Sequence, residues 1–168
     1  MNEALLLELL ERLRGRYFGK YRGTVTDVDA ASMRIKAQVP GVLPGVTTGW
    51  CMPCVPYAGK QVGITMLPDI GSGVWIEFEG GDVSYPIWVG CYWRSGEVPD
   101  GAAAALKAII TTAGKLQFDT DASSITLVDA RGNTLLLNND GMSASAGSGS
   151  IALGASGVNV NNGALEVT

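Results

Sequence analysis

Histidine is absent from this chain of 168 residues. Because imidazole is the only side chain whose ordinary pKa lies near neutrality, its absence excludes Ser-His-Asp and Cys-His triads, HExxH zinc sites and general base catalysis by histidine. Charge is also scarce: 12 basic and 16 acidic residues give a net charge of −4, without the basic excess that binding a phosphate backbone normally requires. We therefore expect no catalytic site, no cofactor, no metal and no nucleic-acid partner.

The sequence also lacks a segment for export or membrane insertion. The leucine-rich start, MNEALLLELLERLRGR, is interrupted by glutamates, has no basic region before it and is shorter than a membrane span. Its leucines at i, i+3, i+4 and i+7 predict a short amphipathic α-helix, which Gly15 ends. This helix either packs on its own domain or docks on another subunit.

Proline, cysteine, tryptophan and tyrosine are missing after residue 100, whereas eleven of the twelve aromatic residues lie between Tyr17 and Trp93. The Pro-Asp-Gly turn in EVPDGAAAA marks the change in composition. The predicted organisation is an N-terminal helix (1–15), a first domain (16–96), a linker (97–108) and a tail (109–168).

The first domain has the strand pattern of a small barrel. The predicted strands are Tyr21–Val28, Met33–Val39, Val62–Leu67, Gly73–Glu79 and Tyr85–Tyr92. Five strands in about eighty residues fit an OB-fold barrel, and the fold class is all-β. Alternation turns Ile76 inward in the fourth strand and Ile87, Val89 and Cys91 inward in the fifth, so that Trp88 faces outward or lies under a loop. The proline-rich segment 40–60 is predicted to be an ordered loop.

Cys51 and Cys54 form a CxxC motif in that loop. Zinc sites usually need a second pair of ligands, but Cys91 is the only further cysteine. A thioredoxin-type dithiol sits at the start of a helix beside a βαβ unit, whereas this motif lies among prolines and strands. We therefore interpret the cysteines as buried and structural. Glu77 and Glu79 share a strand face, which indicates a solvated face more than an acid/base pair.

Apolar pairs at i and i+2 recur in the tail roughly every eight residues, between turns rich in Asn, Asp and Gly. Repeated short strands and turns are the signature of a β-solenoid. One copy alone would expose a one-sided apolar ribbon, but three chains wound about one axis, as an intertwined trimeric β-helix, would bury it. The predicted core at the trimer axis comprises Leu116, Phe118, Ile125, Leu127, Leu135, Leu137, Ile151, Leu153, Val158, Val160, Leu165 and Val167.

Gly23, Val25, Pro40 and Pro53 are followed in order by GSGVWIEFEGGD and PIWVG. In this order, residues 16–96 resemble the OB-fold domain of phage baseplate assembly protein V and of related spike proteins of contractile injection systems. The type VI secretion spike proteins are more distant relatives. In that family the OB domain continues into a trimeric β-helix, which agrees with the repeat in the tail.

The resemblance implies a structural, non-enzymatic central spike that joins the tube hub to the tip and pierces the target envelope mechanically. It implies a homotrimer in a virion tail or injection-particle baseplate, assembled in the bacterial cytoplasm, with hub and baseplate wedge proteins as partners. Some relatives carry a lysozyme domain, for which the linker 97–108 leaves no room. Without histidine the chain cannot form the iron-binding apex of some single-chain spikes, which implies a separate PAAR-type tip protein on Ala164, Leu165, Glu166, Val167 and Thr168.

The same resemblance makes the helix and the aromatic residues candidates for contacts with the hub or a neighbouring subunit, because aromatic anchors concentrate at interfaces. Core packing is the alternative for each aromatic residue. The candidates are Leu6, Leu9, Leu10, Leu13, Trp50, Tyr57, Trp75, Trp88 and Trp93.

Two other functions compete with this interpretation. An OB-fold protein that binds single-stranded nucleic acid would place aromatic residues in a basic groove, but residues 1–100 hold 9 basic against 11 acidic residues. A trimeric β-helix acyltransferase resembles the tail, but it needs a hexapeptide repeat and usually a catalytic histidine. Neither alternative accounts for both halves of the sequence.

Overall fold

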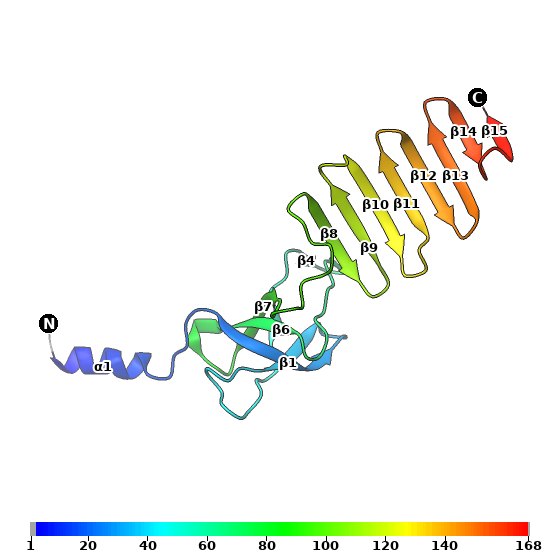
Figure 1. The fold of residues 1–168 in the computed structure, drawn as a ribbon. Helices are drawn as coiled ribbons and strands as arrows, with labels where there is room; N and C mark the ends of the chain where they lie inside the picture. The colour runs from blue at the N-terminus through cyan, green and yellow to red at the C-terminus, as the bar shows by residue number, and fades with distance from the viewer. Residues whose placement is uncertain (1–2, 168) are drawn as a thin grey trace. The chain divides into compact units, whose positions relative to one another are not determined.

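The computed structural model describes residues 3–167 and divides the chain into two units, Met1–Glu97 and Val98–Thr168 (Figure 1). The first unit begins with one helix, α1 (Glu3–Leu13), and continues into a curled sheet. The second unit is a separate antiparallel sheet. The predicted all-β class with one short N-terminal helix is confirmed.

The sheet of the first unit has five strands in the order β2-β1-β6-β7-β3. Their bounds are β1 (Tyr21–Asp29), β2 (Arg34–Gln38), β3 (Met52–Pro53), β6 (Gly73–Phe78) and β7 (Pro86–Tyr92). A short 3-10 turn, η1 (Glu79–Gly81), follows β6. Cys51, just before β3, donates its N–H to the carbonyl of Ile35 in β2 at 2.8 Å. This bridge links the two edges of the curled sheet.

Ten buried residues from these strands and from the segment between β2 and β3 form the core of the first unit. The alternation predicted for β6 is confirmed, because its inward residues are buried and Trp75 between them is only partly covered. The core residues are Val25, Ile35, Ala37, Val39, Val42, Cys51, Val74, Ile76, Phe78 and Trp88.

The predicted barrel strand at Val62–Leu67 is wrong. Only Val62–Gly63 is extended there, as β5, and it pairs with β4 (Ala58–Gly59) in a small hairpin outside the five-stranded sheet. The fifth strand is β3, which lies in the proline-rich segment that the sequence predicts to be a loop. Proline is compatible with this position because β3 is an edge strand, where one backbone N–H needs no partner.

The predicted outward face of Trp88 is also wrong, because β7 contains a bulge. Trp75 pairs with Gly90, whereas the next residue of β6, Ile76, pairs with Trp88. Val89 is therefore an extra residue that reverses the alternation, and Gly90 supplies the φ of 145° at this irregularity.

The bulge places Trp88 in the core beside Ile76. Trp88 is 4% exposed, and its indole Nε1 donates to the carbonyl oxygen of Met33 at 3.3 Å. Ile87 pairs with Glu77 on the opposite face, so its predicted inward position is wrong as well. Trp88 is consequently a core residue and not a surface contact.

Only one of the three cysteines is a core residue. The Cys51 thiol is fully buried, 3.2 Å from the hydroxyl of Thr48, and burial raises its pKa. Cys54 and Cys91 are exposed, and all three thiols are free. The interpretation as buried structural cysteines therefore holds for Cys51 and is wrong for the other two.

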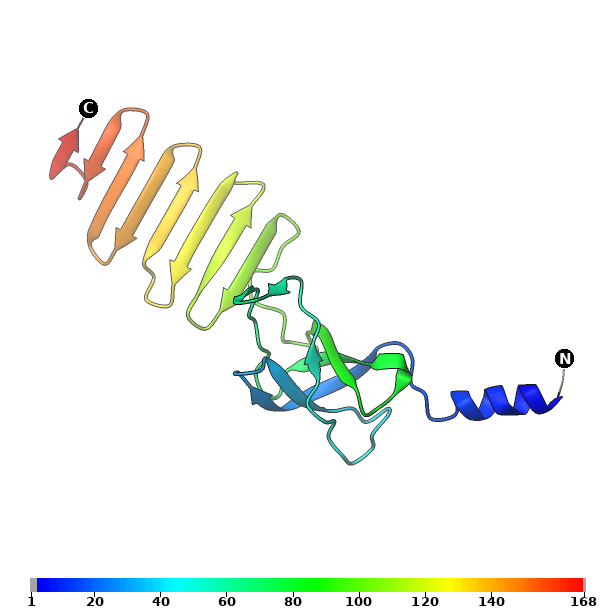
Figure 2. The ribbon, with the colours of Figure 1, turned by 180° about the vertical axis from the view of Figure 1, so that it is seen from behind.

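The second unit is an antiparallel sheet in which every strand pairs with the next one along the chain (Figure 2). The predicted repeat of short strands and turns is confirmed. The strands are β8 (Leu106–Thr111), β9 (Gly114–Asp119), β10 (Ser124–Asp129), β11 (Thr134–Asn138), β12 (Gly141–Ala146), β13 (Gly149–Gly154), β14 (Gly157–Val160) and β15 (Leu165–Val167).

Turn chemistry fixes the register of this sheet. After β10, the Asp129 carboxylate accepts hydrogen bonds from the backbone N–H groups of Arg131 and Asn133 at 2.8 and 2.9 Å. The hydrogen bond from the Asn133 side chain lowers the pKa of Asp129 most. At the start of β12, a Cβ on Gly141 would lie 2.1 Å from the carbonyl oxygen of Leu153, so only glycine allows the strands to approach here.

Replacing the buried tryptophan should destabilise the protein far more than replacing an exposed one. We expect Trp88→Ala to lower the free energy of unfolding by about 3–5 kcal/mol, because it removes a buried ring and leaves a cavity. Trp93 is 66% exposed, and Trp93→Ala should change it by less than about 0.5 kcal/mol. Urea unfolding followed by circular dichroism measures both, and equal midpoints would contradict the placement of Trp88.

Candidate functional site

The register of the second sheet places its apolar residues on one face, because directly opposite residues on antiparallel strands project to the same side. The strand pairings form two continuous ladders. The first ladder contains Ile109, Leu116, Leu127, Leu135, Ala144, Ile151, Val160 and Leu165. The second contains Lys107, Phe118, Ile125, Leu137, Met142, Leu153, Val158 and Val167.

These two ladders are called the apolar face below. By register they contain all twelve residues predicted for the trimer axis core. Sequence reasoning missed Ile109 as a member, although its two-residue spacing from Lys107 continues the pattern by one strand. The pair Lys107/Ile109 continues the i, i+2 pattern of the tail, but only one of its two residues is apolar. The sequence therefore indicates this first pair only weakly.

The apolar face is uncovered in a single chain. Leu127, Ile151 and Leu165 are 47%, 54% and 59% exposed. Not one of the described residues from 98 to 165 is buried, whereas the first unit has a core. A sheet without a buried side chain lacks the apolar burial that drives folding, so this face needs a second surface against it.

The opposite face of the same sheet is more polar and is compatible with exposure to solvent. From β11 to β14, most residues that alternate with the ladders are small or polar, and they pair with one another across the sheet. Leu106, Ile110, Val128 and Leu136 are apolar exceptions on this face. The central row contains Gln117, Thr126, Leu136, Ser143, Ala152 and Asn159.

Ala144 leaves a hollow in the apolar face. Its neighbours in the first ladder are Leu135 and Ile151, and with Leu127 and Val160 they line an open cavity of about 560 Å³. Protein interiors pack by interdigitation of large and small side chains. The hollow can therefore receive side chains from a facing surface of the same apolar kind.

The first unit carries a cluster of aromatic and cationic groups around Trp75. The rings of Trp75 and Tyr92 lie 5.1 Å apart between centroids, and the Arg22 guanidinium carbon lies 5.7 Å from the Trp75 ring centroid. Trp75 is only partly exposed, and its ring is used in contacts within its own chain. It offers less free surface than Trp50, Tyr57 and Trp93.

The other predicted aromatic contacts differ in exposure. Trp50 is 38% exposed and lies under the Lys36 ammonium, which is 4.5 Å from the ring centroid. Tyr57 and Trp93 are 56% and 66% exposed. Surface contacts therefore remain open to Trp50, Tyr57 and Trp93, but not to the buried Trp88.

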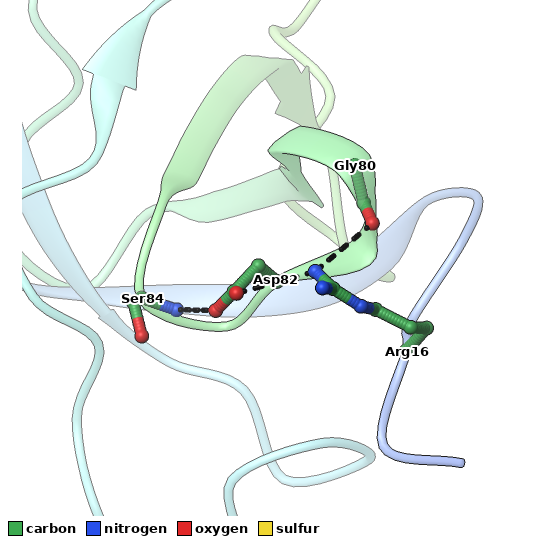
Figure 3. A network of polar contacts seen from close by, with 4 residues as sticks. All are labelled: Arg16, Gly80, Asp82 and Ser84. Carbon is green, nitrogen blue, oxygen red and sulfur yellow. Dashed lines mark hydrogen bonds and ion pairs between the residues drawn. The ribbon is translucent and has the colours of Figure 1, made fainter. Parts of the chain in front are cut away.

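The chain that follows α1 is fastened to the first unit by Arg16 (Figure 3). Its guanidinium donates to the Asp82 carboxylate at 3.2 Å and to the Gly80 carbonyl at 3.3 Å. Asp82 also accepts from the backbone N–H of Ser84 at 3.0 Å, and this hydrogen bond, with help from Arg16, lowers the pKa of Asp82. The backbone N–H of Tyr17 donates to the Gly81 carbonyl at 2.8 Å. The described leucine side chains of α1, from Leu6 to Leu13, stay exposed.

The described residues include no cluster of three or more His, Cys, Asp and Glu side chains that could hold a metal ion. Among the described elements, the one helix is too short to cross a membrane. The apolar face is thus the described feature that needs another surface to bury its side chains.

Two family models match the sequence. Residues 21–93 match the type VI secretion system/phage-baseplate injector OB domain, and residues 107–166 match the phage baseplate V C-terminal trimerisation domain. No curated protein matches the chain. The first match covers the curled sheet, and the second covers the sheet with the apolar face, so the uncovered surface lies within a domain that supports a homotrimer. The chain therefore belongs to the phage baseplate V family of structural baseplate proteins.

Proposed function

We propose that this chain is the central spike of a contractile tail or injection-system baseplate, and that it acts as a homotrimer. The observation that carries the proposal is the apolar face, which runs through all eight strands of a sheet that has no core of its own. The match to a trimerisation domain supplies the number of chains that cover it. In this role the spike joins the tube hub to the tip and pierces the target envelope.

Burial of the apolar face supplies the free energy of assembly. Complete burial of one leucine or isoleucine side chain stabilises by about 1.5–3 kcal/mol, and each chain brings more than ten large apolar residues to the face. Three-fold symmetry brings the three apolar faces together on the axis, where the twelve predicted core residues lie. Wound about each other, the three sheets form the intertwined β-helix.

The mechanical role follows from the backbone of this sheet. Successive strands are joined by hydrogen-bonded pairings from β8 to β15, and no proline occurs after residue 99 to interrupt them. A trimer of such sheets resists bending, because deformation breaks many backbone hydrogen bonds together. Contraction of a sheath then transmits force through the spike to the envelope. This function requires no catalytic side chain, so we propose that the chain has no enzymatic activity.

The ends of the trimer are the proposed sites for partners. β15 pairs only with β14, so its outer edge leaves backbone groups for another protein to bind. We assign this end, residues 164–168, to a PAAR-type tip protein; Thr168 lies outside the described residues. The exposed Trp50, Tyr57 and Trp93 are candidates for contacts with the hub and wedge proteins in the baseplate of the virion or injection particle, after assembly in the cytoplasm.

A charge on the apolar face should break the trimer, whereas the same charge on the opposite face should not. Leu153→Asp would bury three unpaired carboxylates at the axis, at a cost of several kcal/mol. Ala152→Asp is the matched control, because Ala152 pairs with Ser143 and Asn159 on the polar face. We expect Leu153→Asp to lose the trimeric mass in light scattering, or to melt about 10 °C lower, while the control keeps both.

An unchanged mass and melting temperature in Leu153→Asp would contradict the assigned face. Equal damage by both substitutions would contradict the distinction between the two faces.

Imaging the assembled particle tests the place of the chain in it. We expect electron cryo-microscopy of the intact baseplate to show three copies on the tail axis between the hub and the tip, with a separate tip protein on residues 164–168. Copies located away from the axis, or a different number of them, would contradict the proposed spike.

A further inference from the structure

We propose that three copies of α1 pack against one another as a parallel three-helix bundle. The inference rests on the homotrimer of the proposed function and adds a second interface between the same three chains. It is carried by the exposure and spacing of the leucines of α1, by the length of the helix, and by the fastening of the chain behind it.

The leucine stripe of α1 is not covered by its own chain. Its four members are 46–57% exposed, although they lie on one side of the helix. Leu7, which borders the stripe, is 57% exposed. Burial by the barrel of the same chain would have left these side chains far less accessible, so the cover must come from another chain. The four members are Leu6, Leu9, Leu10 and Leu13.

The spacing of the stripe fits a helix with two neighbours. Leu6, Leu9 and Leu13 are separated by three and four residues, which are the a, d and a positions of a heptad. Leu10 occupies the adjacent e position and widens the stripe beyond the narrow seam of a two-stranded coiled coil. A stripe of this width contacts two other helices at once, as each helix of a three-helix bundle does. The exposed Glu11 lies on the far side, at position f.

The length of α1 requires such a partner. The helix has 11 residues, and isolated helices shorter than about 12–15 residues are marginal in water. Three copies held in one trimer meet at an effective concentration of order millimolar, so packing costs little association entropy. Three-fold symmetry makes the bundle parallel and brings each leucine into the same layer as its two copies.

The hydrogen bonds of the segment that follows α1 fix where each of the three helices is attached to its barrel. Gly15, with a φ of +76°, follows the helix, and Arg16 and Tyr17 are already bound to the turn at residues 80–82. Only two residues therefore separate Leu13 from the fastened segment. In a trimer, the three helices are attached at three symmetry-related positions on their barrels. This attachment limits the positions and orientations that the helices can adopt before they pack.

Hydrogen exchange on the isolated full-length trimer tests whether α1 has a partner when the hub is absent. A synthetic peptide of residues 1–16 supplies the unprotected reference. We expect the α1 amides of the trimer to exchange at least about tenfold more slowly than those of the peptide. Leu9→Gln should abolish this protection, because it places an amide in the stripe. Glu11→Gln should retain it, because position 11 faces water.

Cross-linking between chains identifies the partner. Leu9→Cys and Glu11→Cys are made in a background where the exposed Cys54 and Cys91 are serine. A short bis-maleimide should link pairs of Leu9→Cys chains into covalent dimers, because each chain then carries one accessible thiol, and should leave Glu11→Cys chains as monomers under denaturing conditions.

Three results would overturn the bundle. Exchange at the rate of the peptide in a chain of trimeric mass would do so while leaving the proposed function intact. Protection without cross-links between chains would assign the leucine stripe to the barrel of its own chain. Protection that appears only after the hub protein is added would assign the stripe to the hub. A monomeric mass of the unmodified chain would instead remove the proposed function itself.

Discussion

The second unit has an apolar face but, among its described residues, no buried core, and its assembly follows from this condition. Along β8 to β15, large aliphatic residues occupy two ladders, yet none of the described side chains beyond residue 97 is buried. Burial of apolar surface is the dominant favourable contribution to folding, so this sheet needs a second surface against it. In the proposed homotrimer, folding of the tail and assembly of the three chains are one coupled transition.

The first unit satisfies the opposite condition. Its ten core residues are buried within one chain, and the bridge between Ile35 and Cys51 joins the edges of its sheet. The first unit can therefore fold without a partner, and its surface residues remain available for contacts with other proteins. The chain thus combines a unit with its own core and a unit whose apolar face is uncovered in a single chain. The two units match, in this order, the injector OB domain and the phage baseplate V C-terminal trimerisation domain.

The sequence predicts the elements whose pattern is local and regular. Four strands, β1, β2, β6 and β7, are predicted from the sequence, and alternation of apolar residues supports β6 and β7. The repeat in the tail is predictable because its apolar pairs recur at similar intervals. β3 was missed because its pairing with β7 is non-local and its segment is rich in proline. Trp88 was placed on the wrong side because the bulge at Val89 and Gly90 leaves no sign in a pattern of alternation. The members of the apolar face are predictable because their spacing is local, but no described residue of the single chain covers them.

The central claim is that three chains share one core. Sedimentation equilibrium of the unmodified full-length chain, diluted from micromolar to nanomolar concentration, tests it most directly. We expect a single species of three times 17.5 kDa that does not dissociate without unfolding. A folded monomer of 17.5 kDa with an intact tail sheet would contradict it.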